Sequence, residues 1–149
     1  MYKRQVGFSA RRASSSQTIN HSTTTDVVFN TEIKDTNNAY DHSTGIFTAP
    51  VTGFYVIGST WNWADAQGNM DVQTMHIMLD SSQYAVSRVD NASNGTLFTK
   101  ISGSWCSILG TINSGTEIKM RVYIETTNAS AAEILHTDYL TTFWGWNLA

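Results

Sequence analysis

The 149-residue chain has one cysteine, one proline and few charged side chains. A single cysteine, Cys106, cannot form an intrachain disulfide, which excludes a disulfide-bonded scaffold. Because Cys106 lies between apolar neighbours in SWCSILG, we expect a small buried side chain rather than a reactive thiol. Charged residues make up 14% of the chain, against about 25% in an average globular domain.

The sequence also lacks the patterns of three functional classes. Lysine and arginine adjoin only in the pairs KR and RR near the start, so the basic patch that nucleic acid requires is missing. No stretch reaches the roughly 18 apolar residues of a transmembrane helix, and we expect no membrane insertion. There is no GxSxG elbow, no glycine-rich phosphate loop and no metal-ligand spacing among the four histidines. We expect no enzyme activity, although the members of a Ser-His-Asp triad need not be adjacent in sequence.

What the sequence has in quantity is the period-two alternation of half-buried strands. In TEIKMRVYIE the residues of one face are all apolar: Ile118, Met120, Val122 and Ile124. VQTMHIML, SWCSILGTI and TTFWGWNLA are also expected to form strands, and turn signals such as DHSTG and DNASNG separate the runs. This arrangement predicts an all-β sandwich or barrel. RRASSSQTINHSTTT is expected to be an exposed connection, and NASAAEILH a loop with at most one helical turn.

The first five residues, MYKRQ, match translated sequencing-adapter sequence. We expect residues 1–5 to be a non-native leader and the chain to come from an environmental, metagenomic gene fragment. The remaining residues, 6–149, suffice for one domain with a sizeable core.

The stretch YDHSTGIFTAPVTGFY places the only proline, Pro50, between two short apolar runs with a glycine on either side. Gly45 can adopt a backbone conformation closed to other residues, and Pro50 ends a strand because it donates no ladder hydrogen bond. Together with VVFNTEIKDTNNA before it, this stretch resembles the signature of the C1q globular head, in the C1q/TNF superfamily. Six positions of that signature are in register: Phe29, Asp35, Tyr40, Phe47, Gly53 and Tyr55. Its last two aromatic positions depart, with Ile57 and Ser59 in this sequence.

Both ends of the chain resemble the same family. VGFSARR is similar to the family's opening strand, INSGTEIKMRV to a later one and TTFWGWNLA to its closing strand. The resemblance implies an antiparallel, ten-stranded jelly-roll sandwich that assembles as a homotrimer. It also implies that the opening and closing strands lie side by side, close to the trimer axis.

Five tryptophans stand out in a chain of this size. In GFYVIGSTWNW the alternation places five residues on one face: Tyr55, Ile57, Ser59, Trp61 and Trp63. Trp61 and Trp63 are candidates for a ligand platform that stacks on sugar rings, or else for the core. Four other aromatic residues are assigned to the trimer interface or the core: Tyr55, Phe143, Trp144 and Trp146.

The segment NWADAQGNMD is a candidate metal site. Asp65 and Asp71 lie close in sequence, with Asn62, Gln67 and Asn69 as further oxygen ligands of the kind that calcium prefers. Some members of the family hold calcium on this connection, and the resemblance carries that role to Asp71. An ordinary solvated turn is the alternative.

The resemblance implies a non-enzymatic, trimeric recognition head at the C-terminal end of a fibrous, collagen-like or tail-fibre protein. Such a head is extracellular, on a cell surface or on a virion, and binds an unidentified protein or glycan by avidity. A structural clamp that trimerises a stalk is a second hypothesis. A monomeric carbohydrate-binding sandwich that uses Trp61 and Trp63 is a third.

Overall fold

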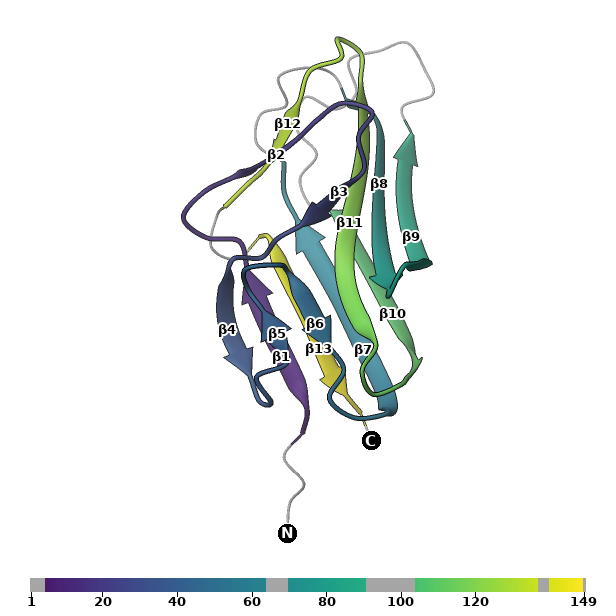
Figure 1. The fold of residues 1–149 in the computed structure, drawn as a ribbon. Coiled ribbons are helices and arrows are strands. Elements are labelled where there is room, and N and C mark those ends of the chain that lie inside the picture. Colours follow the sequence, from purple (N-terminus) through teal and green to yellow (C-terminus); the bar gives the residue numbers. More distant parts are fainter. Residues whose placement is uncertain (1–4, 64–69, 91–103, 137–139, 149) are drawn as a thin grey trace.

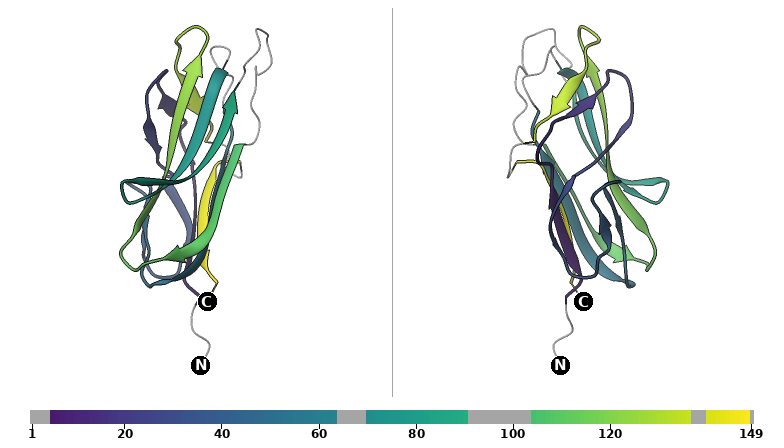
Figure 2. Two further views of the ribbon diagram at one scale, coloured as in Figure 1. Left: turned by 90° about the vertical axis from the view of Figure 1, so that its right-hand side faces the viewer. Right: turned by 60° about the vertical axis from the view of Figure 1, so that its left-hand side comes forward.

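The computed structural model describes residues 5–63, 70–90, 104–136 and 140–148. These residues form thirteen β-strands and no helix, so none of them belongs to a helix long and apolar enough to cross a membrane. The long strands are arranged in two antiparallel sheets that face each other (Figure 1; Figure 2). This is the jelly-roll sandwich expected from the sequence.

The first layer is a five-stranded sheet. Its strands, in spatial order, are β10 (Ser104–Ile112), β7 (Gly53–Trp61), β13 (Thr142–Asn147), β1 (Gly7–Arg11) and β4 (Thr31–Asp35). The opening strand β1 pairs antiparallel with the closing strand β13. The two ends of the described chain therefore lie together at one end of the molecule (Figure 1).

The second layer is a six-stranded sheet. Five of its strands run in the order β5 (Tyr40–Asp41), β6 (Ile46–Thr48), β11 (Glu117–Thr126), β8 (Met70–Leu79) and β9 (Ser82–Asp90), and β3 (Thr25–Val27) also pairs with β11. Two short strands, β2 (Gln17–Ile19) and β12 (Ala132–Ile134), form a separate ladder at the end away from the termini (Figure 1). Along their main strand orders the two layers hold ten strands, the number that the resemblance implied, and β3 is an additional strand beside β11.

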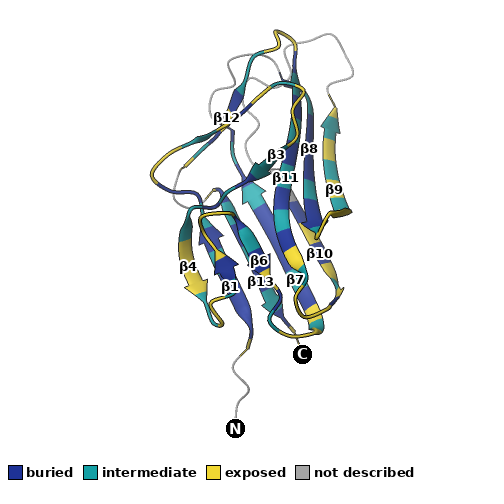
Figure 3. Ribbon diagram, viewed as in Figure 1, coloured by how far each residue is buried: buried dark blue, intermediate teal, exposed yellow. Residues whose placement is uncertain are grey.

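The alternation in the sequence assigns the faces of the long strands correctly. The inward side chains of β11 are fully buried: Ile118, Met120, Val122 and Ile124. Tyr55, Ile57, Ser59 and Trp61 of β7 are buried in the same way, whereas Phe54 on the opposite face is 42% exposed. Dark and light segments alternate along these strands in Figure 3. Apolar side chains of both sheets form one continuous core.

An aromatic cluster around Phe8 lies at the centre of this core. The Phe8 ring stacks on Phe47 and Tyr40, with centroid distances of 4.2 and 5.3 Å, and meets the edge of Phe143 at 4.8 Å. The Tyr40 hydroxyl donates a hydrogen bond to the Phe29 carbonyl. The aromatic spacing recognised in the sequence is therefore a set of core contacts that joins the two sheets.

Two other positions of that stretch, Asp35 and Gly45, shape its turns. The Asp35 carboxylate accepts hydrogen bonds from the backbone N–H groups of Asn37, Ala39 and Tyr40, which closes the turn between β4 and β5. Gly45 has a φ of +78°, and an ideal Cβ there would lie 2.8 Å from the Val27 carbonyl oxygen. Both the conformation and the space thus require glycine at this turn.

Two expectations for the polar segments were wrong. NASAAEILH contains no helical turn; its residues 132–134 form strand β12, with Ala132 and Ile134 buried and Glu133 exposed. The strand pairs with β2, which lies inside the stretch expected to be an exposed connection. The error arose because three residues are too short for alternation to separate a strand from a loop. Ile19, the apolar residue of β2, is fully buried and gives this ladder its core contact.

The segment from 12 to 30, which we call the N-terminal arm, links β1 to β4 across the end of the sandwich. Its anchor is the largely buried Arg12, whose guanidinium donates to the carbonyls of Val28 and Ser16 and to Gln17 Oε1. Gln17 in turn donates to the carbonyl of Asp26 and accepts from the N–H of Val28. This network of hydrogen bonds joins the two ends of the arm and holds them together.

Candidate functional site

The main candidate surface is the side of the five-stranded sheet that faces away from the core. Alternation places five large apolar side chains there, and we call this surface the tryptophan face: Phe54, Val56, Leu109, Trp144 and Trp146. Leu109 is 58% exposed and Phe54 42% exposed, and the other three are half-buried. A contiguous exposed apolar surface is typical of a site for association.

Strand register brings three of these residues into one row. Leu109 of β10 pairs with Val56 of β7, which pairs with Trp146 of β13. The row ends on β1, where Trp146 pairs with Gly7. An apolar row therefore crosses four adjacent strands of the sheet.

Glycines allow both indole rings of this face to lie close to the sheet. An ideal Cβ on Gly7 would lie 2.0 Å from Cε3 of Trp146, and one on Gly58 would lie 2.5 Å from Cζ2 of Trp144. Each ring therefore covers a glycine of a neighbouring strand, β1 for Trp146 and β7 for Trp144. The sequence GFSA and the glycine in YVIGST are explained by these contacts, which alternation alone does not reveal.

One cation contacts the tryptophan face. The Lys34 ammonium lies 5.0 Å from the centroid of the Trp146 ring, within the range of a cation–π interaction. Lys34 belongs to β4, the edge strand next to β1. A charge at this edge limits the apolar surface on one side.

The two other residues assigned to core or interface lie in the core. Tyr55 and Phe143 are fully buried, and the Tyr55 hydroxyl donates to the Val51 carbonyl at 2.8 Å. Burial raises the pKa of Tyr55, although hydrogen bonds with Asn147 and Val51 partly offset this effect. Within one chain, only Trp144 and Trp146 of the four aromatic residues are available to a partner.

The expected ligand platform of Trp61 and Trp63 is not formed by the described chain. Both rings are buried, with 0% and 4% exposure, and they meet edge to face at an interplanar angle of 86°. Trp63 Nε1 donates to the buried Gln73 side chain. A sugar platform needs an exposed ring face, so these two tryptophans are corrected from ligand-binding to core residues.

Asp71 lies at the start of β8, where its Oδ1 accepts a hydrogen bond of 3.0 Å from the Thr127 hydroxyl. Asp65, Gln67 and Asn69 lie outside the described residues. Among the residues that are described, no three His, Cys, Asp or Glu side chains gather in a group that could hold a metal ion. The described oxygens near Asp71 thus fall short of the six to eight that calcium takes, and calcium at Asp71 stays a prediction.

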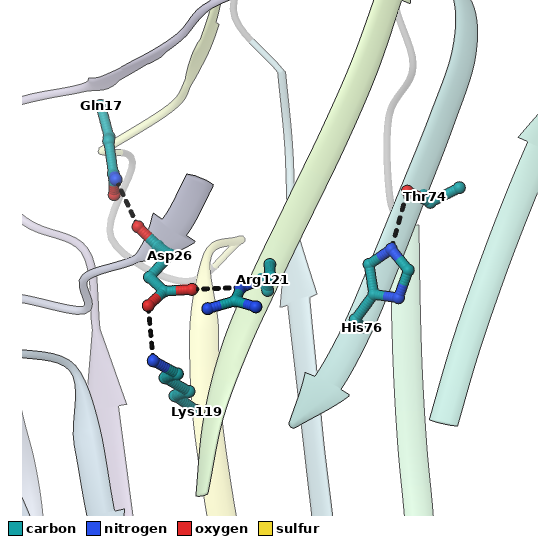
Figure 4. A network of polar contacts seen from close by, with 6 residues as sticks. All are labelled: Gln17, Asp26, Thr74, His76, Lys119 and Arg121. Carbon is teal, nitrogen blue, oxygen red and sulfur yellow. Dashed lines mark hydrogen bonds and ion pairs between the residues drawn. The ribbon is translucent and has the colours of Figure 1, made fainter. Parts of the chain in front are cut away.

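The outer face of the six-stranded sheet is polar and carries a charge cluster (Figure 4). Asp26 accepts from Lys119 at 2.7 Å and from Arg121 at 2.5 Å. Partial burial raises the pKa of Asp26, but the hydrogen bonds and charges of Arg121 and Lys119 outweigh it and leave that pKa below its ordinary value. The cluster fastens β3 to β11 and sets two cations against one carboxylate.

His76 lies beside this cluster on β8, with Nε2 2.9 Å from the Thr74 hydroxyl (Figure 4). Burial lowers the pKa of His76, and the Arg121 charge lowers it further against a hydrogen bond with Gln83. His76 Nδ1 has no hydrogen-bond partner among the described residues, so the acid that orients the imidazole of a catalytic triad is not bonded to it. Burial raises the pKa of Cys106, which disfavours its thiolate.

An open polar groove of about 640 Å³ lies on one side of the sandwich, between β4 and the β5–β6 hairpin. Its lining includes Glu32, Asp41, His42 and Glu117. Hydrogen bonds from the hydroxyl and N–H of Ser43 lower the pKa of Asp41, so its carboxylate is already satisfied.

The fold and the apolar outer face of the five-stranded sheet define a jelly-roll domain of the C1q/TNF class. The family model described as "C1q domain" matches residues 7–146. The chain therefore belongs to the C1q family. Members of this class are generally ligand-binding or signalling domains without enzyme activity.

Solved structures share this fold at low sequence identity. The Eiger TNF of S. frugiperda superposes with a TM-score of 0.70 at 10% identity, covering 99% of this chain and 94% of its own. Murine APRIL gives 0.69 at 9% identity, covering 97% and 100%. The globular domain of zebrafish complement 1qA gives 0.62 at 14% identity, covering 97% and 98%. No curated protein sequence matches the chain.

Proposed function

We propose that this domain is a non-enzymatic recognition head that assembles as a homotrimer through the tryptophan face. The observation that carries the proposal is the row of Leu109, Val56 and Trp146 across the five-stranded sheet. These side chains are exposed or half-buried in the single chain, although each is as apolar as the core residues behind it. Burying apolar surface contributes about 25 cal/mol per Å², so association of copies through this face is favourable.

The position of the termini supports display on a stalk. The described chain begins and ends at the same end of the sandwich, on the neighbouring strands β1 and β13. A stalk joined before β1 would leave the opposite end, with β2 and β12, pointing away from it. Three copies held in parallel would present three identical surfaces, and weak single contacts would add through avidity.

The proposed setting is the C-terminal end of a fibrous, collagen-like or tail-fibre protein outside the cell or on a virion. Domains of this class are typically secreted or displayed on a surface. The proposed ligand is a protein or a glycan bound without chemical change.

A second function, a structural clamp that only trimerises a stalk, is favoured by one observation. On the outer face of the six-stranded sheet, the charges of Lys119 and Arg121 are both directed at Asp26 of the same chain. Because both cations are already bonded to Asp26 of the same chain, they are less available to bind an external partner. The two functions share the trimer and differ in whether a ligand binds.

The trimer is tested with Leu109→Asp, which places a charge at the β10 end of the apolar row. We expect the wild type to scatter light as three chains and the variant as one, because an unpaired carboxylate buried in an interface costs several kcal/mol. The matched control is Val86→Asp. Val86 is 50% exposed and lies on β9 of the other sheet.

The controls separate assembly from folding. Far-ultraviolet circular dichroism should be the same for the wild type and both variants, because Leu109 and Val86 are exposed in the single chain. A monomeric wild type, or dissociation by Val86→Asp but not by Leu109→Asp, would refute the proposed interface. A trimer that binds no glycan or surface protein in an array would favour the clamp.

A further inference from the structure

We propose that His21 is an acid-sensitive tether that holds the turn of the N-terminal arm against the end of β11. The tether releases when the imidazole takes up a second proton. The inference concerns the end of the molecule away from the termini and does not depend on the proposed trimer.

The tether is a hydrogen bond with fixed donor and acceptor. The backbone N–H of Thr126 donates to Nδ1 of His21 at 3.0 Å. A backbone amide can only donate, so Nδ1 must carry a lone pair and the ring proton must lie on Nε2. Thr126, the last residue of β11, is 4% exposed, and its N–H group donates to this histidine nitrogen.

His21 cannot take up a second proton and keep its hydrogen bond with the Thr126 N–H group. A second proton on the ring sits on Nδ1 and faces the Thr126 N–H. The Thr126 hydroxyl lies 3.3 Å from Nδ1 and already donates to the Ser130 carbonyl, so its oxygen is free to accept the new proton. The buried Thr126 N–H would still lose its acceptor, and an unsatisfied buried donor is costly. The ring must therefore turn away.

The nearby carboxylates do not hold the protonated His21 ring in place. The carboxylates on the neighbouring elements are Asp71 on β8, Glu117 and Glu125 on β11, Glu133 on β12 and Asp26 on β3, and the cations on β11 are Lys119 and Arg121. Asp71 accepts from Thr127, Glu125 from Tyr123, and Asp26 from its two cations. Within the described ranges, none of these carboxylates is bonded to the His21 ring, so none anchors it in the protonated form.

Release would affect the turn and not the whole domain. The turn has one other bond to β11, from the Ser22 N–H to the Ile124 carbonyl at 2.9 Å. On either side, the arm stays attached through the β2–β12 and β3–β11 ladders. Ser22 also has a φ of +52°, a conformation that a side chain rarely adopts, so the closed turn is held against backbone preference. Acidification thus loosens one local segment.

The test is amide hydrogen exchange of the full chain, followed residue by residue by NMR. A ring that carries a proton on Nδ1 cannot accept from the Thr126 N–H, so opening should be greater at pH 5 than at pH 7.5. We expect this increase at the Thr126 amide after correction for the intrinsic pH dependence of exchange. Amides in the centre of β11 should not share it.

The matched variant is His21→Asn, whose side-chain oxygen can occupy the Nδ1 position and does not titrate. We expect the pH-dependent part of Thr126 exchange to disappear in this variant. The control is His136→Asn. His136 Nδ1 lies 3.0 Å from the Ser16 hydroxyl, which can donate or accept, so this contact survives protonation.

The nitrogen chemical shift of His21 Nδ1 is a second measurement, which reports whether this nitrogen is protonated and requires no variant. At pH 7.5 it should be that of an unprotonated ring nitrogen, and it should change together with the Thr126 amide signal on acidification. Thr126 exchange that is equal at both pH values would overturn the proposal. So would a pH dependence that His21→Asn leaves unchanged, or a protonated Nδ1 at pH 7.5.

Discussion

At the scale of single residues, Asp26 shows how one carboxylate fastens a three-residue strand. β3 has few backbone bonds of its own, and Asp26 adds ion pairs to both Lys119 and Arg121 of β11. All three side chains remain partly exposed, between 22% and 36%, so solvent screens the attraction. The cluster therefore stabilises locally and modestly.

Replacing this carboxylate with an amide should lower the free energy of unfolding at pH 7 by about 1 kcal/mol, the upper end for exposed pairs. The folded-state pKa of Asp26 is depressed, so its contribution is present above the unfolded value, about pH 4, and is lost as pH falls through the folded value. Urea unfolding of wild type and Asp26→Asn should thus differ at pH 7, and the difference should shrink as pH falls through the folded-state pKa of Asp26.

The matched change for that measurement is Asp90→Asn. Asp90 pairs with Arg88 at 2.7 Å, but the two side chains are 45% and 56% exposed. We expect a smaller loss of stability than for Asp26→Asn, because solvent screens this more exposed pair more strongly. A larger loss for Asp90→Asn than for Asp26→Asn would contradict the account of the charge cluster.

At the scale of elements, sequence alternation predicted the long strands well and the short ones poorly. Nine or ten residues of β7 and β11 give several full periods, and their inward faces are those expected. Three residues of β12 give no such signal, and its pairing with β2 depends on contacts between residues 113 to 117 positions apart along the chain. Only the tertiary fold decides such ladders.

The same limit explains the error on Trp61 and Trp63. Alternation correctly placed both on one face with Tyr55 and Ile57. Alternation shows on which face of the strand a residue lies, and not how deeply the residue is buried. The buried neighbours on that face, Tyr55 and Ile57, were the better guide to the burial of both tryptophans. Trp144 and Trp146 had the same alternating signal but lie on the outward face. Their glycine neighbours, on other strands, could not be assigned from sequence.

The glycine contacts of β7 and β13 lead to a prediction at this scale. Gly58→Ala adds a methyl group 2.5 Å from the Trp144 ring, which must then lift from the sheet. We expect a weaker trimer, with at least a tenfold higher dissociation constant by dilution light scattering, because tight packing of interface aromatics is lost. Gly110→Ala is the control, since its methyl group meets only the mobile hydroxyl end of Tyr84 at 2.9 Å. Equal effects of the two changes would contradict this role for Gly58.

At the scale of the whole molecule, two faces of one sandwich have opposite chemistry. The outer face of the six-stranded sheet pairs its charges within the chain, whereas the five-stranded sheet leaves an apolar row open. Both sheets bury their inner faces in one core, so this asymmetry is not needed for folding. An apolar outer surface that the fold does not require is best explained by association.

If apolar contact holds the assembly together, removing divalent metal should not dissolve it. We expect the purified chain to scatter light at three times its 16.5 kDa mass, both with and without a calcium chelator. The reason is that Leu109, Val56 and Trp146 offer apolar surface only, and salt or chelator does not weaken its burial. Asp71→Asn should leave the mass unchanged as well. Dissociation by the chelator, reproduced by Asp71→Asn, would instead assign the assembly to a metal held at the start of β8.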